Sequence, residues 1–281
     1  TGDASLNPWV RDGDVIQVQP GLYALAAPVD VVVEITILGP QANVNPLPSR
    51  GSLRVPGDTS TEAVFDGLGL VAPMVRIVSS NVEINGLEFR NGSGDMVVSE
   101  VGTPTSDVIL RNNIIHDSSG DEGVQLRAVT GAVVECNHVY ATAGDGINLC
   151  CGSTDGSIRF NEVHDIQSPD AAVYVYDATG TTIEGNLVYV TTSNDGIKLG
   201  SKNGDDAAKS GGTILNNTVQ NTAQDGIAVY MSRTTVRCNE VSGSTSENGG
   251  IYAAWGISDV AILDNYVHDN SFNTGKWGDP A

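Results

Sequence analysis

Short runs of alternating apolar and polar residues recur along most of this chain. Residues 122–126 read Glu-Gly-Val-Gln-Leu, residues 145–149 read Asp-Gly-Ile-Asn-Leu, and residues 195–199 read Asp-Gly-Ile-Lys-Leu. Successive side chains of a strand point to opposite faces, so this alternation predicts short strands with one buried face. Apolar spacing typical of a helix is absent from the sequence. The pattern therefore predicts an all-β protein.

A second pattern gives these runs a common period. An Asn followed two residues later by a branched apolar residue recurs at steps of 22 to 31 residues, at Asn113, Asn137, Asn161, Asn186, Asn217, Asn239 and Asn265, and Asn85 fits as an earlier member. Thr-Ile and Val-Val pairs mark a third strand in each repeat. Three strands per repeat, separated by Gly, Asn, Asp and Ser turns, predict a right-handed parallel β-helix of about ten coils. Stacked coils would align the Asn residues in a structural hydrogen-bonded ladder.

The repeat continues along most of the chain, which favours a single domain over residues 1–281. We expect irregular N-terminal coils over 1–70 with an insertion at 41–63, regular coils over 75–270, and a second insertion at 200–212. The start at Thr1 without Met and the end at Ala281 suggest a mature or excised fragment of a longer protein.

The chain is strongly acidic. It has 34 Asp and Glu against 14 Lys and Arg, a formal charge of −20, which argues against nucleic-acid and anionic-membrane partners. No apolar run approaches the roughly 18 residues that span a bilayer. We expect a secreted or cell-surface protein. Carboxylate-rich sites suit Ca²⁺, which would let an acidic chain hold an anionic glycan.

Four cysteines give no zinc or haem motif. Cys136 and Cys238 each precede a repeat Asn, which places them at equivalent positions four coils apart, about 19 Å, too far to bond. Cys150 and Cys151 either form a vicinal disulfide or pack as thiols, and packing as thiols is the preferred interpretation.

The repeats resemble those of the pectate-lyase-like superfamily of single-stranded right-handed β-helices. The opening, Asp14-Val-Ile-Gln-Val-Gln-Pro-Gly-Leu-Tyr followed by Val33-Glu-Ile-Thr-Ile-Leu-Gly-Pro, is similar to the first coils of many extracellular members. The resemblance covers most of the chain. It implies the fold and a polysaccharide or glycan partner, but the superfamily includes lyases, hydrolases, uronan epimerases, adhesins and tailspikes, so it does not fix the activity.

One outer face of the predicted solenoid has the composition of a sugar-binding groove. In the run that contains Asp-Gly-Ile, the apolar residues point inward, so the residues between them form exposed columns. One column is Gln125, Asn148, Tyr174, Lys198, Ala228 and Tyr252, and its neighbour is Arg127, Cys150, Tyr176, Gly200, Tyr230 and Ala254. We expect Arg127, Asn148, Tyr174, Tyr176, Tyr230 and Tyr252 to bind an extended sugar chain.

The resemblance also implies a lyase chemistry for this face. Lyases of the superfamily use Ca²⁺ on Asp or Glu to neutralise a uronate carboxylate, and a Lys or Arg as base. Carried over, Lys198 would be the base, and Asp145, Asp195 and Asp225 would hold Ca²⁺, with Asp195 and Asp225 counted among the catalytic residues. The structural alternative is that each Asp caps its turn and that Lys198 is an ordinary surface lysine.

Two other functions stay open. The chain would be a non-catalytic adhesin, fibre or tailspike-like β-helix if its uncapped ends self-associate. It would be an inverting hydrolase if Asn194-Asp195-Gly and Gln224-Asp225-Gly carry its carboxylates. The pairs His116-Asp117, His164-Asp165 and His268-Asp269 resemble metal ligands, but His116 and His164 are two coils, about 10 Å, apart, and we expect a turn ladder instead.

Overall fold

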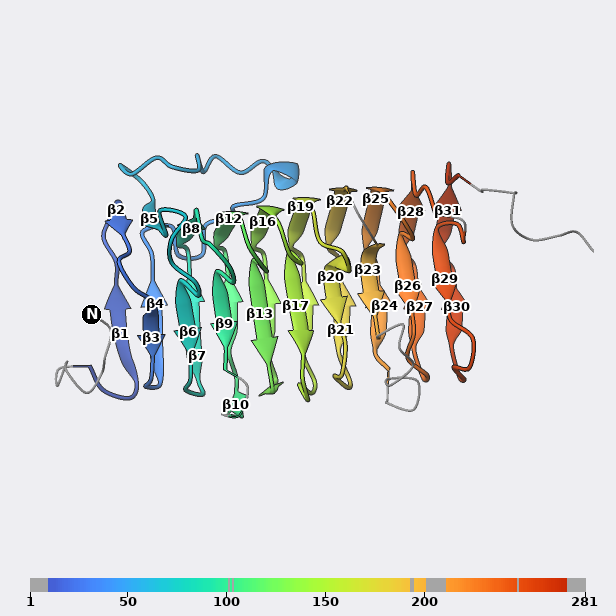
Figure 1. Ribbon diagram of the computed structural model, residues 1–281, viewed down its shortest axis with the longest axis horizontal. Coiled ribbons are helices and arrows are strands. Elements are labelled where there is room, and N and C mark those ends of the chain that lie inside the picture. Colours follow the sequence, from blue (N-terminus) through green and yellow to red (C-terminus); the bar gives the residue numbers. More distant parts are fainter. Residues whose placement is uncertain are drawn as a thin grey trace, which may run out of the picture.

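The computed structural model describes residues 10–100, 102, 104–192, 195–200, 211–246 and 248–271. Its strands form three long parallel sheets that wind as a solenoid (Figure 1). Two sheets contain ten strands and one contains nine. The described residues contain no α-helix and one short 3₁₀ helix, η1 (Pro48–Arg50). The prediction of a parallel β-helix of about ten coils is confirmed.

Sheet A is built from the strand that precedes the repeat Asn in each coil. Its order is β1 (Asp14–Gln17), β4 (Ile35–Leu38), β7 (Val82–Asn85), β11 (Ile109–Arg111), β15 (Val133–Glu135), β18 (Ser157–Arg159), β21 (Thr182–Glu184), β24 (Thr213–Leu215), β27 (Thr235–Arg237) and β30 (Ala261–Leu263).

Sheet B is built from the strand that follows the repeat Asn. Its order is β2 (Gly21–Ala24), β5 (Ala63–Asp66), β8 (Glu88–Arg90), β12 (Ile114–Ser118), β16 (His138–Thr142), β19 (Glu162–Ile166), β22 (Leu187–Thr191), β25 (Thr218–Thr222), β28 (Glu240–Ser242) and β31 (Tyr266–His268).

Sheet C holds the runs that contain Asp-Gly-Ile. Its order is β3 (Val29–Val31), β6 (Val75–Ile77), β9 (Val97–Ser99), β13 (Val124–Arg127), β17 (Ile147–Cys150), β20 (Ala171–Val175), β23 (Asp195–Leu199), β26 (Ile227–Val229) and β29 (Ile251–Ala253). A small separate sheet pairs β10 (Thr105–Ser106) with β14 (Val129–Thr130).

The core is a set of apolar columns that run along the solenoid axis. One column of sheet A places each apolar side chain directly above its equivalent in the next coil, as Leu110, Val134, Ile158, Ile183, Ile214 and Val236. Each of these side chains is buried. Every coil therefore buries its apolar residues against its two neighbours, which is why a repeat of this length suffices for a core.

The Asn residues from Asn113 to Asn265 form the predicted ladder, but the assignment of Asn85 to it was wrong, because Asn85 pairs in register with Arg111 and Leu87 takes the ladder position. The side-chain oxygen of Asn161 accepts hydrogen bonds from the backbone N–H (2.9 Å) and the side-chain amide (3.1 Å) of Asn137, in the preceding coil. The Asn161 amide donates to Asn186 in the next coil and to the carbonyl of Val134. The ladder satisfies polar groups at a buried turn, where an unpaired backbone N–H would be costly.

Replacing Asn161 by Ala is expected to lower the free energy of unfolding by about 2–3 kcal/mol, because it removes four buried hydrogen bonds and orphans the N–H of Asn137. The midpoint of urea unfolding measures the loss. Asn265→Ala is the matched control, since Asn265 has the same role in the last described coil but is only part-buried. Equal losses of unfolding free energy in Asn161→Ala and Asn265→Ala would contradict the stabilisation assigned to the buried hydrogen bonds of Asn161.

The cysteines give one confirmation and one correction. Cys136 (φ 53°) and Cys238 (φ 55°) occupy the same left-handed turn position in their coils and are free. Cys150 and Cys151 are joined in a vicinal disulfide, so the preferred interpretation of packed thiols was wrong. Adjacent Cα atoms are 3.8 Å apart here, and the sequence could not decide between the two states because they require the same positions.

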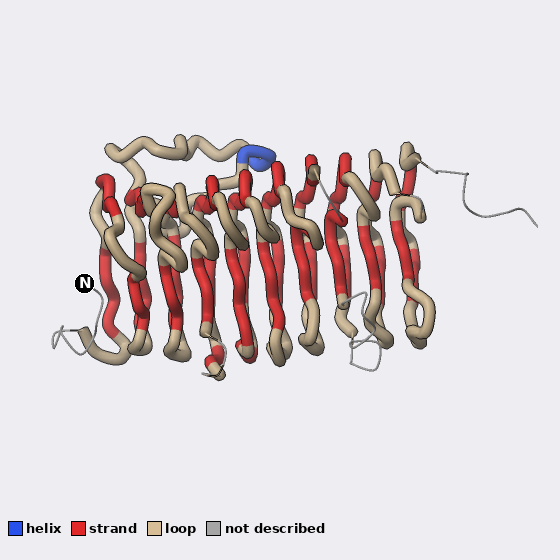
Figure 2. Tube along the Cα trace, in the orientation of Figure 1, coloured by secondary structure: helices blue, strands red, loops and turns tan. Residues whose placement is uncertain are grey.

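The segment between β4 and β5 leaves the stack and lies along sheet B. It extends from the first coils to η1 beside β19 and then returns to β5 (Figures 1 and 2). The backbone N–H of Ser49 donates to Glu162 (2.9 Å), 113 residues away, and Arg54 pairs with Glu62. Of the insertion predicted at 200–212, residues 201–210 lie outside the described residues. Among the described residues, no helix has the length and apolar character needed to cross a membrane.

Candidate functional site

The register of sheet C aligns the predicted columns. Gln125 pairs with Asn148, Asn148 with Tyr174, and Tyr174 with Lys198. The column continues through Ala228 to Tyr252 in the same register. However, the prediction that these positions are exposed was wrong for most of the column. Equivalent side chains of adjacent coils lie about 4.8 Å apart and cover one another.

The burial is nearly complete in the middle of the column. The exposed fraction is 5% for Gln125, 2% for Asn148, 6% for Tyr174 and 0% for Lys198. The neighbouring positions Arg127, Tyr176 and Tyr230 and the last member of the first column, Tyr252, are half-buried. Of the six expected sugar-binding residues, Arg127, Tyr176, Tyr230 and Tyr252 therefore keep a surface that a ligand can touch, and Asn148 and Tyr174 lie beneath it.

Lys198 is not an ordinary surface lysine. Its ammonium lies 2.9 Å from the carboxylate of Asp170, 4.6 Å from the centre of the Tyr174 ring and 5.9 Å from that of Tyr230. An ammonium over an aromatic face is attracted to it, and the Asp170 pair adds a charge partner. Asp170 is 45% exposed, so the lysine is buried while its counter-ion reaches solvent.

Asp145, Asp195 and Asp225, the expected Ca²⁺ ligands, do not form one cluster: Asp145 lies two coils from Asp195, whereas Asp195 and Asp225 lie on adjacent coils. Asp145 accepts the backbone N–H of Ala171 (3.2 Å), and Asp195 accepts that of Asp225 (3.1 Å). Ala171 pairs with Asp195, so one full coil separates Asp145 from Asp195. All three carboxylates are buried. Their observed role is to tie turns of adjacent coils, which is the turn function that the sequence left as the alternative.

Asp145 also has an unusual titration. Burial, the largest effect, raises its pKa to about 6, although hydrogen bonds from Ser168, Asn148 and the N–H of Ala171 favour the charged form. A carboxyl group that titrates close to neutral pH is a feature of functional sites. Asp145 remains a candidate for chemistry as well as for structure.

Three other carboxylates do converge on this face. Asp95, Asp121 and Glu122 bring one oxygen each within 4.8 Å of one another. Arg127 lies beside them, with a guanidinium nitrogen 3.7 Å from Asp95. Burial, together with hydrogen bonding to Asp121 and Asp95, raises the pKa of Glu122 to about 10. Sequence analysis identified the strand that begins at Glu122 but did not connect this residue with Asp95 and Asp121, which lie in turns.

Several acceptor oxygens around this cluster are buried without a hydrogen-bond partner. They are Asp95 Oδ1, Glu122 Oε2, Gln125 Oε1 and Asn148 Oδ1. The amide groups of Gln125 and Asn148 each donate to the carboxylate three residues earlier, which leaves their oxygens unpaired. Buried acceptors without donors are uncommon in native proteins, and a missing water or cation is a standard explanation.

The histidines on sheet B form the expected ladder. His116, Tyr140, His164 and Tyr189 stack with ring centroids 4.7, 5.2 and 4.7 Å apart. Asp117 and Asp165, which follow the histidines, adopt left-handed turn conformations (φ 59° and 54°). Sequence analysis missed His138, which lies beside this ladder and contacts His164.

Comparisons with known proteins agree with the architecture. A family model described as a right-handed β-helix region matches residues 74–205, and one described as periplasmic copper-binding protein (NosD) matches residues 152–275. The A-module of mannuronan C-5 epimerase AlgE6 from Azotobacter vinelandii superposes with a TM-score of 0.71 at 14% identity, over 91% of this chain and 68% of that one. The chain is a right-handed parallel β-helix, the architecture that these proteins share. No curated protein matches the sequence.

Two further structures share the superfamily fold. Pectate lyase Pel9A superposes with a TM-score of 0.55 at 13% identity, over 99% of this chain and 76% of that one. The periplasmic alginate epimerase AlgG superposes with a TM-score of 0.54 at 12% identity, over 91% of this chain and 75% of that one. At such identities the likeness shows the fold alone, so the activity of this β-helix must be argued from its own residues.

Proposed function

We propose that this β-helix is a secreted or cell-surface protein that acts on an acidic polysaccharide along the outer face of sheet C, as a Ca²⁺-dependent lyase. The observation that carries the proposal is the cluster of Asp95, Asp121 and Glu122 beside Arg127. Tyr176 and Tyr230 continue the row of accessible side chains along the solenoid axis. Aromatic rings pack on sugar faces, and a guanidinium pairs with a uronate carboxylate.

The carboxylate cluster fits Ca²⁺ better than the three aspartates first expected to hold it. Oxygen-rich sites with several carboxylates suit this cation, and the unpaired oxygens of Asp95, Glu122 and Gln125 would gain a partner. When bound, the ion would pair with a uronate carboxylate and hold the sugar chain on this face.

Lys198 remains the proposed base. It would take the proton next to the carboxylate of a uronate farther along the same sugar chain, because β13 and β23 are three coils, about 14 Å, apart. The freed electron pair would form the double bond, and the glycosidic oxygen would leave from the next carbon and take a proton from solvent. The Lys198 ammonium is covered, so this role requires Asp170 to move away and the lysine to lose its proton. Among the described partners of Lys198, Asp170 is 45% exposed, so its displacement would disturb the fold little.

The test follows proton removal directly. Polyuronates and glycosaminoglycans are incubated in D₂O with Ca²⁺ or chelator, and NMR follows deuterium uptake beside the carboxylate while ultraviolet absorbance follows the unsaturated product. Lys198→Ala is expected to lower the rate about 10²-fold or more, the usual contribution of a general base. Asp170→Asn should retain or raise the rate, because it releases the lysine.

The outcomes separate the candidate functions. Deuterium uptake without absorbance would indicate epimerisation, which shares the first step. Retention on an acidic glycan column without either signal would support a non-catalytic binding β-helix, and new reducing ends without unsaturated product would support hydrolysis. Self-association through the solenoid ends stays a prediction, tested by sedimentation at increasing protein concentration.

A further inference from the structure

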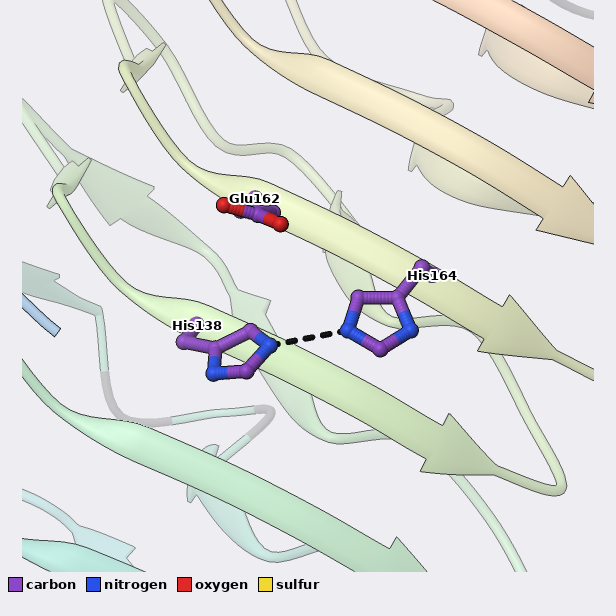
Figure 3. Close-up of side chains that lie close together, drawn as sticks. All are labelled: His138, Glu162 and His164. Carbon is purple, nitrogen blue, oxygen red and sulfur yellow. Dashed lines mark hydrogen bonds between the residues drawn. The ribbon is translucent and has the colours of Figure 1, made fainter. Parts of the chain in front are cut away.

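A second group of potential ligands lies on a different face, the outer side of sheet B. His138 of β16 pairs in register with Glu162 of β19, and His164 follows two residues later on the same strand. Side chains two residues apart share a face of a strand, so all three point outward together. One ligand atom from each lies within 4.8 Å of the other two. Figure 3 shows the two imidazoles facing one another with the carboxylate beside them.

The two imidazole rings approach through nitrogen atoms. Nε2 of His138 lies 2.8 Å from Nε2 of His164. The other nitrogen of His164, Nδ1, lies 2.7 Å from the carboxylate of Asp165, which accepts but cannot donate when ionised. Neutral His164 therefore carries its proton on Nδ1 and turns the lone pair of Nε2 toward His138. His138 either donates an Nε2 proton to this lone pair or, with its proton on Nδ1, turns a second lone pair into the gap, which a metal ion would then fill.

The surroundings of His138 and Glu162 favour the protonation states that bind metal. Burial, assisted by the neighbouring His164, lowers the pKa of His138 to about 4, so its ring is neutral at physiological pH. Burial alone would raise the pKa of Glu162, but hydrogen bonds from Ser49 and from the hydroxyl of Tyr189 outweigh it and lower the pKa. Neutral imidazoles and an ionised carboxylate are the ligand forms of these side chains.

We propose that His138, Glu162 and His164 bind one transition-metal ion that prefers imidazole ligands, Zn²⁺ or Cu²⁺. Two histidines and one glutamate form a known zinc-ligand set that leaves one coordination position open. Tetrahedral ligands at about 2.0 Å from the ion lie about 3.3 Å apart, so the two nitrogens need to separate by only a few tenths of an ångström. The site is distinct from the polysaccharide face and does not depend on it.

The surroundings supply the outer contacts that metal ligands require. Asp165 fixes the ring orientation of His164, and both oxygens of Glu162 accept one hydrogen bond each, from Tyr189 (2.9 Å) and from the N–H of Ser49 (2.9 Å). Such partners commonly orient metal ligands. Because Ser49 belongs to the 39–62 segment, a bound ion would strengthen the attachment of that segment to sheet B.

Binding of Zn²⁺ and Cu²⁺ to the tag-free protein, measured by isothermal titration calorimetry, tests the proposal. We expect one saturable equivalent and an increase of several degrees in Tm, with no comparable effect of Mg²⁺. His138→Gln and His164→Gln should each weaken binding by about 10²-fold or more, and isosteric Glu162→Gln by about 10-fold. Electron paramagnetic resonance of the Cu²⁺ form should show coupling to two nitrogens, and to one in either histidine variant.

Two matched variants control for unspecific effects. His116→Gln alters the same ladder one coil from His138 and two coils from His164, and His268→Gln removes a histidine that has the same type of Asp partner. Both should bind like the wild type. Undiminished binding in folded His138→Gln and His164→Gln, checked by circular dichroism, would overturn the proposal. So would the absence of saturable binding by the wild type, which would leave a proton between the two nitrogens.

Discussion

Replacing Arg54 by Met is expected to lower the free energy of unfolding by about 3–5 kcal/mol, because it leaves a buried carboxylate without its counter-ion. Arg54 and Glu62 form two hydrogen bonds, of 2.9 and 2.7 Å, and their side chains are 2% and 0% exposed. The guanidinium also donates to the backbone carbonyl of Asn112 on the main stack. The pair therefore holds the 39–62 segment against the coils.

The double variant Arg54→Met/Glu62→Met separates the net contribution of the ion pair to stability from the destabilisation caused by leaving one partner unpaired. Replacing a whole buried ion pair with apolar residues is often neutral, so the double variant should recover most of the stability that the single variant loses. Urea unfolding measures both, and amide exchange over residues 39–62 shows whether the segment detaches first. A double variant as unstable as the single one would contradict this account.

The sequence determined the coils because their signals are local. Two local signals show which residues face the core: the alternation within each strand and the Asn before each sheet B strand. The number of residues from one Asn to the next gives the register between coils. The columns of sheet C followed from the same counting, so Gln125, Asn148, Tyr174 and Lys198 pair as predicted. Parallel stacking makes such counting reliable, since identical positions lie above one another.

Burial of these columns could not be read from alternation. An outward direction implies exposure only when a side chain projects beyond its neighbours, and at the spacing of stacked coils long side chains cover one another. Lys198 shows the effect most clearly: it points away from the core and yet has no exposed surface. Its partner Asp170 lies in a turn outside the regular repeat, where spacing gives no register.

The histidine group was missed for a different reason. The sequence comparison followed one ladder position from coil to coil, and on that ladder His116 and His164 are two coils apart. His138 lies two positions earlier in its strand, on the same face and on the coil adjacent to His164. Diagonal neighbours of this kind are within reach of long side chains, so comparing both outward positions of each strand would have found the pair.

The stability of the wild-type protein is expected to fall between about pH 5 and about pH 10 when Ca²⁺ is absent, and Glu122→Gln should remove most of this fall. Burial raises the pKa of Glu122 to about 10 from an ordinary value of 4.5, with further contributions from Asp121 and Asp95. A folded-state pKa above the unfolded one gives a stabilisation that is complete below the unfolded pKa and is lost as pH rises through the folded pKa.

The size of the effect is on the order of 3 kcal/mol after discounting for solvent screening around a partly exposed cluster. Thermal unfolding at several pH values in chelator measures it. Glutamine keeps the shape of the side chain and has no proton to lose, so the variant should gain stability relative to the wild type as pH rises. Glu184→Gln on sheet A controls for the loss of one negative charge. A fall that persists unchanged in Glu122→Gln would place the responsible group elsewhere.

Ca²⁺ should counteract the fall in stability at rising pH if the cluster of Asp95, Asp121 and Glu122 is its site. Metal binding to carboxylates releases their protons, so affinity rises with pH over the range in which the metal-free protein loses stability. Millimolar Ca²⁺ is therefore expected to raise Tm most at alkaline pH in the wild type, with proton release detectable in weakly buffered solution. In Glu122→Gln the rise in Tm and the proton release should both decrease, because the proton and the cation occupy the same buried oxygens. Stabilisation by Ca²⁺ that is equal in the two proteins would separate the cation from this cluster while leaving the pH dependence of Glu122 intact.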